Sequence, residues 1–411
     1  MSEKPEIIKN NDYHDKLYAQ IQHDNSPRKT VKVLHLSDPH PDFEYFEGAN
    51  ANCGKPVCCR IDDGLPERPE DAAPKYGHPN CDAPSIVLES AFEYLKNFPV
   101  EEKPDLILWT GDNTPHDVWK QSVMKNALYT VKMTEFLEEN LPDIPVISAL
   151  GNHEFYPVNV MEIDSVDPVI KSLAKVWANY LDDEALAMFK KYGYYSQKVM
   201  LDDPSWSDVR VISINSEQCN EMNWYLWSSL GDPNNEIAWF ESELKKAEAA
   251  NEKVLLIAHF PSMSCNHAFG ARYKALLERY QHLIRLQLYG HSHDEQWYMN
   301  KGIKDGKPIA VQYGNPSLGT RGGKNPGFRV FTLDAETMLP IQITRHYLNL
   351  TEANNGNPVW TKMYDVTEEY GFKSLSPSDY DNVIKSFNSG NVQTLKRMIA
   401  NEDGKFEFKS E

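Results

Sequence analysis

Five short polar groups in this sequence carry side chains that are suited to binding metal ions. Each group directly follows a run of apolar residues, and a glycine immediately precedes three of them. The groups are Asp38-x-His40, Gly111-Asp112, Gly151-Asn152-His153-Glu154, His259 and Gly290-His291-x-His293. Residues two apart on an extended backbone point to the same side, so each D-x-H or H-x-H pair can converge on one point.

Each group also has an ordinary structural explanation when it is taken alone. Asp38 and Asp112 suit turns or helix N-caps, and an isolated histidine such as His40 or His259 is often a hydrogen-bonded core residue. Five such groups after five apolar runs favour a metal site instead. Two Asp, one Asn and four His suit two divalent ions, with Zn²⁺ favoured by the imidazoles and Mn or Fe as alternatives.

The apolar runs predict the strands that position these groups. Strands are predicted at 31–37, 105–109, 144–149, 253–258 and 286–289. Helical patterns lie between them, and alternating strand patterns occupy residues 307 to 346. Ligands bind at the carboxyl ends of strands in open α/β sheets. The sequence therefore predicts a layered α/β sandwich with its site at one edge of the sheets.

The composition excludes some classes of partner. The formal net charge of −18 over 411 residues, without a continuous basic stripe, argues against binding duplex nucleic acid. No apolar run is long enough for a transmembrane segment. The first residues lack an apolar h-region, so no signal peptide is predicted.

The six cysteines predict disulfide bonds and an oxidising environment. Four of them lie in one Gly- and Pro-rich segment between Cys53 and Cys81. A zinc knuckle is the alternative, but the adjacent pair Cys58-Cys59 lacks the C-x-x-C spacing. We expect a secreted or lysosome-like protein, and a leader removed before this chain begins would explain the missing signal peptide.

The order of the polar groups resembles that of the calcineurin-like metallophosphoesterases, and residues from about 31 to 385 resemble their acid sphingomyelinase branch. Further blocks that carry the resemblance are 45–48 (YFEG), 53–60 (CGKPVCCR), 81–84 (CDAP), 116–119 (HDVW), 325–329 (NPGFR) and 347–351 (YLNLT). The resemblance implies a four-layer αββα fold. We expect an N-terminal arm at 1–29, a catalytic domain at 30–346 with a disulfide-rich insertion at 41–83, and a small helical subdomain at 347–411.

The resemblance also implies a role for each polar residue. One zinc would take Asp38, His40 and His293, the other Asn152, His259 and His291, and Asp112 would bridge them. A hydroxide held by the metals would attack phosphorus in line. His153 and His116 would protonate the leaving oxygen, or would instead orient ligands as structural braces.

The resemblance further implies the disulfides Cys53–Cys59, Cys58–Cys81 and Cys219–Cys265. Asn349 begins the only Asn-x-Ser/Thr sequon and is the predicted glycosylation site in a secreted chain.

The substrate expected from the resemblance is sphingomyelin, cleaved to ceramide and phosphocholine, with transient contact with a membrane surface. Arg321 aligns with an aromatic position of the sphingomyelinases and would suit a second anion, unless it points to solvent. Trp224 and its neighbours offer aromatic surface for choline or lipid, unless they are buried. The alternatives are an enzyme of nucleotides such as ATP or CDP-choline, or of other soluble phosphodiesters, and a catalytically silent binding protein.

Overall fold

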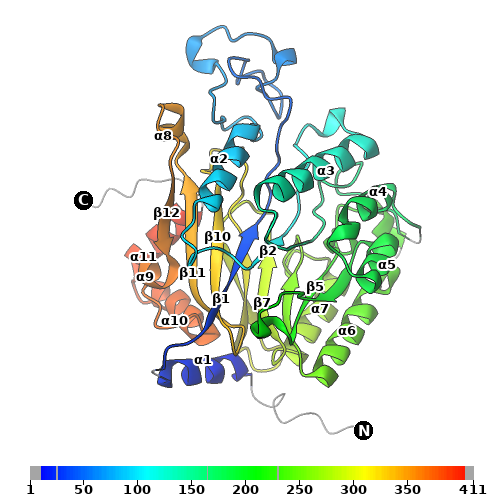
Figure 1. Cartoon of the computed structure of the whole chain (residues 1–411), viewed down its shortest axis with the longest axis vertical. Coiled ribbons are helices and arrows are strands. Elements are labelled where there is room, and N and C mark those ends of the chain that lie inside the picture. Colours follow the sequence, from blue (N-terminus) through cyan, green and yellow to red (C-terminus); the bar gives the residue numbers. More distant parts are fainter. Residues whose placement is uncertain (1–10, 25, 164, 229–230, 403–411) are drawn as a thin grey trace.

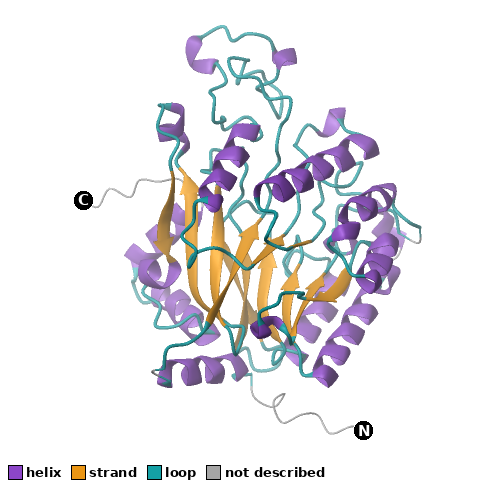
Figure 2. Ribbon diagram, viewed as in Figure 1, coloured by secondary structure: helices purple, strands orange, loops and turns teal. Residues whose placement is uncertain are grey.

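The computed structural model describes residues 11–24, 26–163, 165–228 and 231–402. Two six-stranded sheets pack face to face, and helices cover their outer faces (Figure 2). Among the described residues, no helix has both the length and the apolar character needed to cross a bilayer. The layered α/β sandwich with αββα order that the sequence predicts is confirmed.

The first sheet has the strand order β12-β11-β10-β1-β2-β3. Its parallel strands are β1 (Thr30–Leu36), β2 (Leu106–Trp109) and β3 (Val146–Ser148). The antiparallel strands that complete it are β10 (Gly327–Asp334), β11 (Pro340–Leu348) and β12 (Trp360–Asp365).

The second sheet has the strand order β4-β5-β6-β7-β9-β8. Its parallel strands are β5 (Val209–Ser213), β6 (Lys253–Ile257), β7 (Ile284–Tyr289) and β9 (Pro308–Gly314). The two edges are the antiparallel strands β4 (Tyr195–Lys198) and β8 (Gln296–Lys301).

Helices form the outer layers and cap the C-terminal side of the sandwich. The helices before residue 260 are α1 (Tyr13–His23), α2 (Ser85–Lys96), α3 (Val123–Asn140), α4 (Pro168–Val176), α5 (Asp183–Tyr192) and α6 (Glu236–Ala250). Those after it are α7 (His267–Arg279), α8 (Leu350–Asn354), α9 (Val366–Tyr370), α10 (Pro377–Asn388) and α11 (Val392–Glu402).

Strand β2 shows why the predicted apolar runs become buried strands. Successive side chains alternate between the faces of a sheet. Leu106 and Leu108 pack into the core between the two sheets, whereas Ile107 and Trp109 pack with residues of α2 and α3 on the outer face. Because both faces are covered, all four residues are apolar, which is typical of parallel sheets.

The segment 41–83 forms a loop-rich projection at the top of Figure 1, coloured blue. Two disulfides hold it, but their predicted pairing was wrong, because the structure has Cys53–Cys58 and Cys59–Cys81. The Cys59 backbone adopts a left-handed φ of 71°, so the side chains of Cys58 and Cys59 point in different directions. Cys58 thus reaches back across a short turn to Cys53. The third predicted disulfide, Cys219–Cys265, is present as expected.

The sequence analysis expected a helical subdomain at 347–411, but this region also contains a β-strand. Strand β12 adds to the edge of the first sheet through its pairing with β11, which itself extends past residue 347. Low apolar density concealed this strand, because an edge strand buries few side chains; Thr361 and Lys362 are exposed. Residues 1–10 of the predicted N-terminal arm lie outside the described part, and residues 13–23 form α1.

A buried ion cluster fastens the insertion to the loop that follows β2. Nε of Arg60 donates to Asp42 at 2.7 Å, and a terminal nitrogen of Arg60 donates to Asp117. Both carboxylates are fully buried, and Arg60 itself is only 4% exposed. Lys125 also contacts Asp117, at 3.1 Å, whereas Asp42 has its ion pair with Arg60 alone among the described residues. Arg60 therefore matters most for Asp42, since uncompensated buried charge is strongly destabilising.

We predict that Arg60→Ala lowers the free energy of unfolding by about 3–5 kcal/mol, because it removes the ion pair of the buried Asp42 and one of the ion pairs of Asp117. Arg68→Ala is the matched control, since Arg68 pairs with Asp71 on the surface of the same insertion; its effect should stay within about 0.5 kcal/mol. Urea unfolding followed by circular dichroism measures both. Equal effects of the two substitutions would contradict a structural role for the buried cluster.

Candidate metal centre

The loops that follow five strands bring the predicted polar groups to one place. Strands β1, β2 and β3 lead into the first three groups, and β6 and β7 lead into His259 and the His291–His293 turn. Backbone hydrogen bonds join the loops: the N–H of Asp38 donates to the carbonyl of Gly111 at 3.0 Å, and that of His40 to the carbonyl of Asp112 at 3.2 Å. The loops after β1 and β2 therefore lie side by side at the ends of their strands.

Four of the predicted ligands form a first cluster whose ligand atoms all lie within 4.8 Å of one another. They are Asp38, His40, Asp112 and His293. The two Nε2 atoms of His40 and His293 are 3.2 Å apart, and Nε2 of His293 is 3.6 Å from Oδ1 of Asp38. Imidazole nitrogens and carboxylate oxygens converging at these distances surround a position suited to a divalent ion.

Asp112 also belongs to a second cluster, with His259 and His291. Nε2 of His259 lies 3.1 Å from Oδ2 of Asp112 and 2.9 Å from Oδ1 of Asn152. The same Asn152 oxygen lies 3.2 Å from Nδ1 of His291. The structure thus brings all seven predicted side chains together in two groups that share one carboxylate.

Backbone carbonyls set the orientation of two of the imidazoles. Nδ1 of His40 donates to the carbonyl of Thr114 at 2.6 Å, and Nδ1 of His259 donates to the carbonyl of Thr110 at 2.7 Å. In each ring the other nitrogen, Nε2, faces the cluster. This arrangement is typical of metal-binding histidines, whose second nitrogen is held by a hydrogen bond.

Burial controls the charge of most of the histidines. It holds the pKa of His40 and of His293 well below the usual range and lowers the pKa of His291 to about 3. These rings are therefore neutral, which is the form that binds a metal. Burial also disfavours the charged form of His259, but Asp112 and Asp38 outweigh it and raise the pKa of His259 to about 10. The carboxylates thus attract positive charge at this position.

Glycines allow the strand ends to approach one another. A Cβ atom on Gly151 would lie 2.1 Å from Oδ1 of Asp112, and one on Gly290 would lie 2.2 Å from Oγ of Ser37. A Cβ on Gly111 would lie 2.4 Å from the backbone nitrogen of Gly151. Backbone and side-chain atoms of the cluster fill the space that any larger residue needs, so each glycine is required at its position.

Five of the seven predicted ligands have left-handed backbone conformations. These are Asp38, His40, Asp112, His291 and His293, with φ between 36° and 74°. Asp, Asn and His tolerate this region better than most residues, yet it still carries strain. Such strain persists only where the surrounding fold imposes it, and it clusters at functional sites.

Glu154 is a structural residue of the site to which the sequence analysis gave no role. Its buried carboxylate accepts hydrogen bonds from the backbone N–H groups of Gly151 at 2.6 Å, Asp112 at 3.0 Å and Asn113 at 2.6 Å. One side chain thereby fastens the loops after β2 and β3. In the sequence, the position of Glu154 in the Gly-Asn-His-Glu group was the feature that could have indicated this role.

The two predicted proton donors lie beside the first cluster. The His116 ring is 4.0 Å from that of His40 and 4.6 Å from that of His153, between centroids. His116 also lies close enough to His40 and His293 to share a metal with them. Nδ1 of His153 is buried without a protein partner, and burial lowers the pKa of His153 to about 4.

Asp82 positions His116 and was also missed by the sequence analysis. Its two oxygens accept from Nδ1 and from the backbone N–H of His116, both at 2.6 Å. Asp82 is fully buried and directly follows Cys81 of the insertion. The insertion therefore supplies Asp82, the group that orients the predicted acid His116. In the sequence, the block Cys81-Asp82-Ala83-Pro84 was the feature that could have indicated this role.

The remaining predicted residues lie outside the two clusters. Arg321 donates to the carbonyl of Pro56 through two nitrogens, each at 3.3 Å, so it is tied to the insertion rather than pointing freely into solvent. Trp224 is exposed, in contrast to the alternative that it is buried. Asn349 is the N-cap of α8 and accepts from the N–H of Glu352. Substrate contact by Arg321 and Trp224 and glycosylation of Asn349 stay predictions.

The donor set fits two divalent ions. The groups combine imidazoles, an amide oxygen and two carboxylates, and Asp112 is placed to contribute to both positions. Burial favours protonation of Asp112, but His259 and its neighbours hold the pKa of Asp112 well below the usual range. The shared carboxylate is therefore anionic, which a bridging ligand requires.

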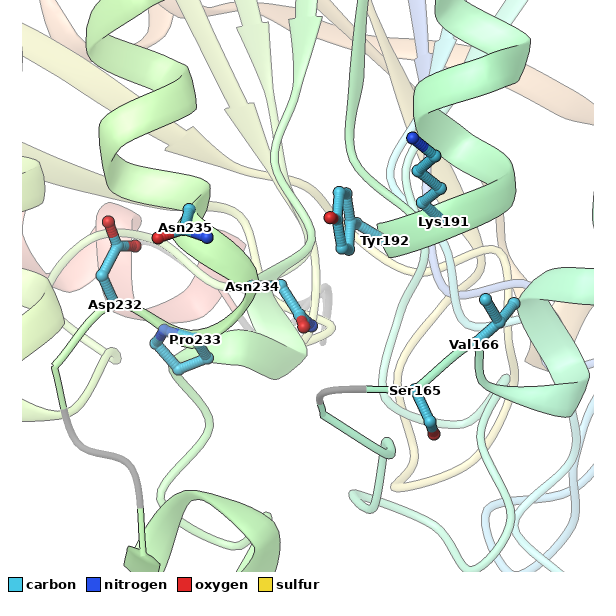
Figure 3. A pocket seen from close by; sticks show the side chains of 8 residues that line it. All are labelled: Ser165, Val166, Lys191, Tyr192, Asp232, Pro233, Asn234 and Asn235. Carbon is cyan, nitrogen blue, oxygen red and sulfur yellow. The ribbon is translucent and has the colours of Figure 1, made fainter.

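A cavity of about 600 Å³ lies elsewhere, between the ends of α5 and α6 (Figure 3). Its lining includes Lys191, Tyr192 and the residues Asp232 to Asn235. None of the seven predicted ligands lines it. The convergence of ligand atoms, rather than the size of a hollow, therefore identifies the functional site.

Comparison with known protein families gives two matches along the chain. Residues 31–295 match the calcineurin-like phosphoesterase family, and residues 314–401 match the acid sphingomyelin phosphodiesterase C-terminal region. All seven predicted ligands lie in the first match. The second match includes Arg321, strands β10 to β12 and most of the C-terminal helices.

Individual relatives are named as phosphodiesterases. The chain is 34% identical to sphingomyelin phosphodiesterase B of Dictyostelium discoideum, over 89% of this chain and 58% of that protein. It is 30% identical to human sphingomyelin phosphodiesterase, over 86% of this chain and 57% of that protein. It is 29% identical to human acid sphingomyelinase-like phosphodiesterase 3b, over 89% of this chain and 81% of that protein. The chain thus spans under two thirds of the first two relatives.

We predict that Gly151→Ala lowers the metal content of the purified protein at least severalfold, because the new methyl group would collide with Asp112. Gly231→Ala is the control, since a Cβ there meets no atom within 4 Å. Elemental analysis by mass spectrometry, with circular dichroism to verify folding, measures the effect. A folded Gly151→Ala protein with full metal content would show that the close approach is not needed for metal binding.

Proposed function

The chain belongs to the calcineurin-like phosphoesterase family, and on that premise we propose that it is a metal-dependent phosphodiesterase that holds two zinc ions and hydrolyses sphingomyelin to ceramide and phosphocholine. The observation that carries the proposal is the pair of ligand clusters that share Asp112. Asp38, His40 and His293 would hold one ion, and Asn152, His259 and His291 the other. The C-terminal match and the relatives' names support sphingomyelin as the substrate.

Two divalent ions bound there would supply positive charge for an anionic phosphodiester and Lewis acidity toward its phosphorus. The two carboxylates would neutralise only part of that positive charge, so the site would attract anions. The family resemblance favours Zn²⁺, while Mn or Fe suit the same ligands.

The histidines beside the first cluster would supply the proton that the reaction requires. The leaving oxygen needs a proton when its bond to phosphorus breaks. Asp82 holds Nδ1 of His116, which leaves Nε2 as the nitrogen able to exchange a proton with substrate. His153 lies beside it, with a buried Nδ1 that has no protein partner, so the two rings can donate to one leaving oxygen.

A second candidate substrate is a nucleotide such as ATP or CDP-choline. Arg321 favours it, because its guanidinium is close enough to Asp82 to help to keep the pKa of that buried carboxylate low, beside the stronger effect of His116. A cation near the site suits a second anionic group better than a quaternary ammonium. The third alternative is a binding protein that retains the fold without catalysis.

The disulfides support a secreted or lysosomal location, because such bonds persist in oxidising compartments. A glycan on Asn349 would agree with that location.

We predict that the protein as purified contains about two metal ions per chain and hydrolyses sphingomyelin in mixed detergent micelles faster than ATP or CDP-choline. Chelation should abolish turnover, and added Zn²⁺ should restore it. Phosphocholine release and nucleotide release are measured separately. Faster nucleotide turnover would support the second substrate, and a metal-loaded protein without any phosphodiesterase activity would support a binding role.

We predict that His153→Ala retains the metals but lowers kcat by about 100-fold or more, because it removes a proton donor. His23→Ala on the exposed end of α1 is the control and should leave both properties unchanged. Metal analysis and steady-state kinetics on one preparation measure the two effects. Unchanged turnover in His153→Ala would assign His153 a purely structural role.

A further inference from the structure

Exposed apolar side chains lie on two segments that border the metal centre, and the first of these includes the start of α3. The first segment, 118–128, follows His116 closely and exposes Trp119 and Met124. The second, 222–227, exposes Met222, Trp224 and Trp227. Large exposed apolar groups that gather on one part of a protein indicate an interaction surface. We call these two segments the aromatic rim.

Hydrogen bonds connect both segments of the aromatic rim to the turn that carries Asn152 and His153. In the first segment, Nδ2 of Asn126 donates to the carbonyls of His153 at 3.2 Å and Phe155 at 2.9 Å. Near the second, Nδ2 of Asn220 donates to Oδ1 of Asn159 at 3.1 Å, and the N–H of Asn159 donates to the carbonyl of Asn152 at 3.2 Å. The rim is therefore continuous with the predicted ligand loops.

The second segment is held in an outward-facing conformation. Leu226 is buried, and the buried Asn223 side chain donates to the carbonyls of Met161 at 3.1 Å and Glu217 at 3.2 Å. The disulfide Cys219–Cys265 fastens the chain three residues before the segment begins. These anchors hold the turn while Trp224 and Trp227 remain 49% and 76% exposed.

We propose that the aromatic rim is a docking surface for a zwitterionic phospholipid bilayer, which presents the phosphodiester to the metal centre. Tryptophan and tyrosine favour the membrane interface, where an apolar ring and a polar edge are both accommodated. The net charge of −18 opposes adsorption to anionic lipid, so apolar contact rather than charge attraction drives binding. The inference rests on the proposed function, because it explains how a lipid substrate reaches the site.

The test uses the full chain and vesicles of phosphatidylcholine with sphingomyelin, separated by flotation. The double variant Met124→Ser/Trp227→Ser removes one exposed side chain from each segment, which are 82% and 76% exposed. Binding of this variant should fall about tenfold and binding of the native protein should change little between low and high salt. Quenching of tryptophan fluorescence by brominated phosphatidylcholine should fall in the same variant.

The matched control is Val100→Ser/Ile303→Ser, which removes side chains that are 85% and 64% exposed at the opposite ends of the strands. This variant should bind vesicles like the native protein. Absence of vesicle binding by the native protein, unchanged binding by the rim variant, or an equal loss in the control would each overturn the proposal. Absence of vesicle binding would leave a protein partner as the occupant of the rim.

Hydrolysis of bis(4-nitrophenyl) phosphate separates this inference from the proposed function. The rim variant should cleave this soluble diester at the native rate while its hydrolysis of vesicle sphingomyelin falls. A native protein that cleaves the soluble diester but does not bind vesicles would refute the docking surface alone. A native protein that binds vesicles through the rim but cleaves no diester would refute the proposed function alone.

Discussion

The buried carboxylate of Asp112 is the group on which the arrangement of this protein depends. It lies within reach of imidazoles from both clusters, so the loops after β1, β2, β6 and β7 all have to end beside it. Burying such a charge is costly unless it is paired. The fold meets this requirement with histidines around the carboxylate, and with Glu154 holding the backbone on which Asp112 sits. A divalent ion in either cluster would satisfy the same charge.

The insertion at 41–83 contributes to the site although it lies outside both sheets. Its Asp82 orients His116, its Arg60 is buried against Asp117, and its Pro56 carbonyl accepts from Arg321. The disulfide Cys59–Cys81 holds the residue next to Asp82. A segment without regular strands can therefore position a predicted catalytic side chain, because covalent bonds and buried ion pairs replace the packing that a sheet would supply.

The aromatic rim and the metal centre have opposite physical characters. The centre gathers charge in a buried site, whereas the rim presents apolar rings to solvent at some cost in hydration. A lipid phosphodiester has the same two parts, an anionic phosphodiester group and an apolar body. The juxtaposition in this protein thus matches the chemistry of the proposed substrate at both ends. In the proposed function, Trp227 would contact the lipid surface and Asp112 would help to hold the metal ions that bind the phosphodiester.

The sequence by itself determined the sheet architecture and the set of candidate ligands, because apolar runs followed by Asp, Asn or His are local patterns that can be recognised in one sequence. It did not determine the pairing of Cys53 and Cys58, the strand β12 or the roles of Glu154 and Asp82. Those depend on backbone direction, as at the left-handed Cys59, or on partners far away in the chain, as for Asp82 and His116. Only the tertiary structure decided them, because a hydrogen bond or disulfide forms between positions in space rather than between residue types.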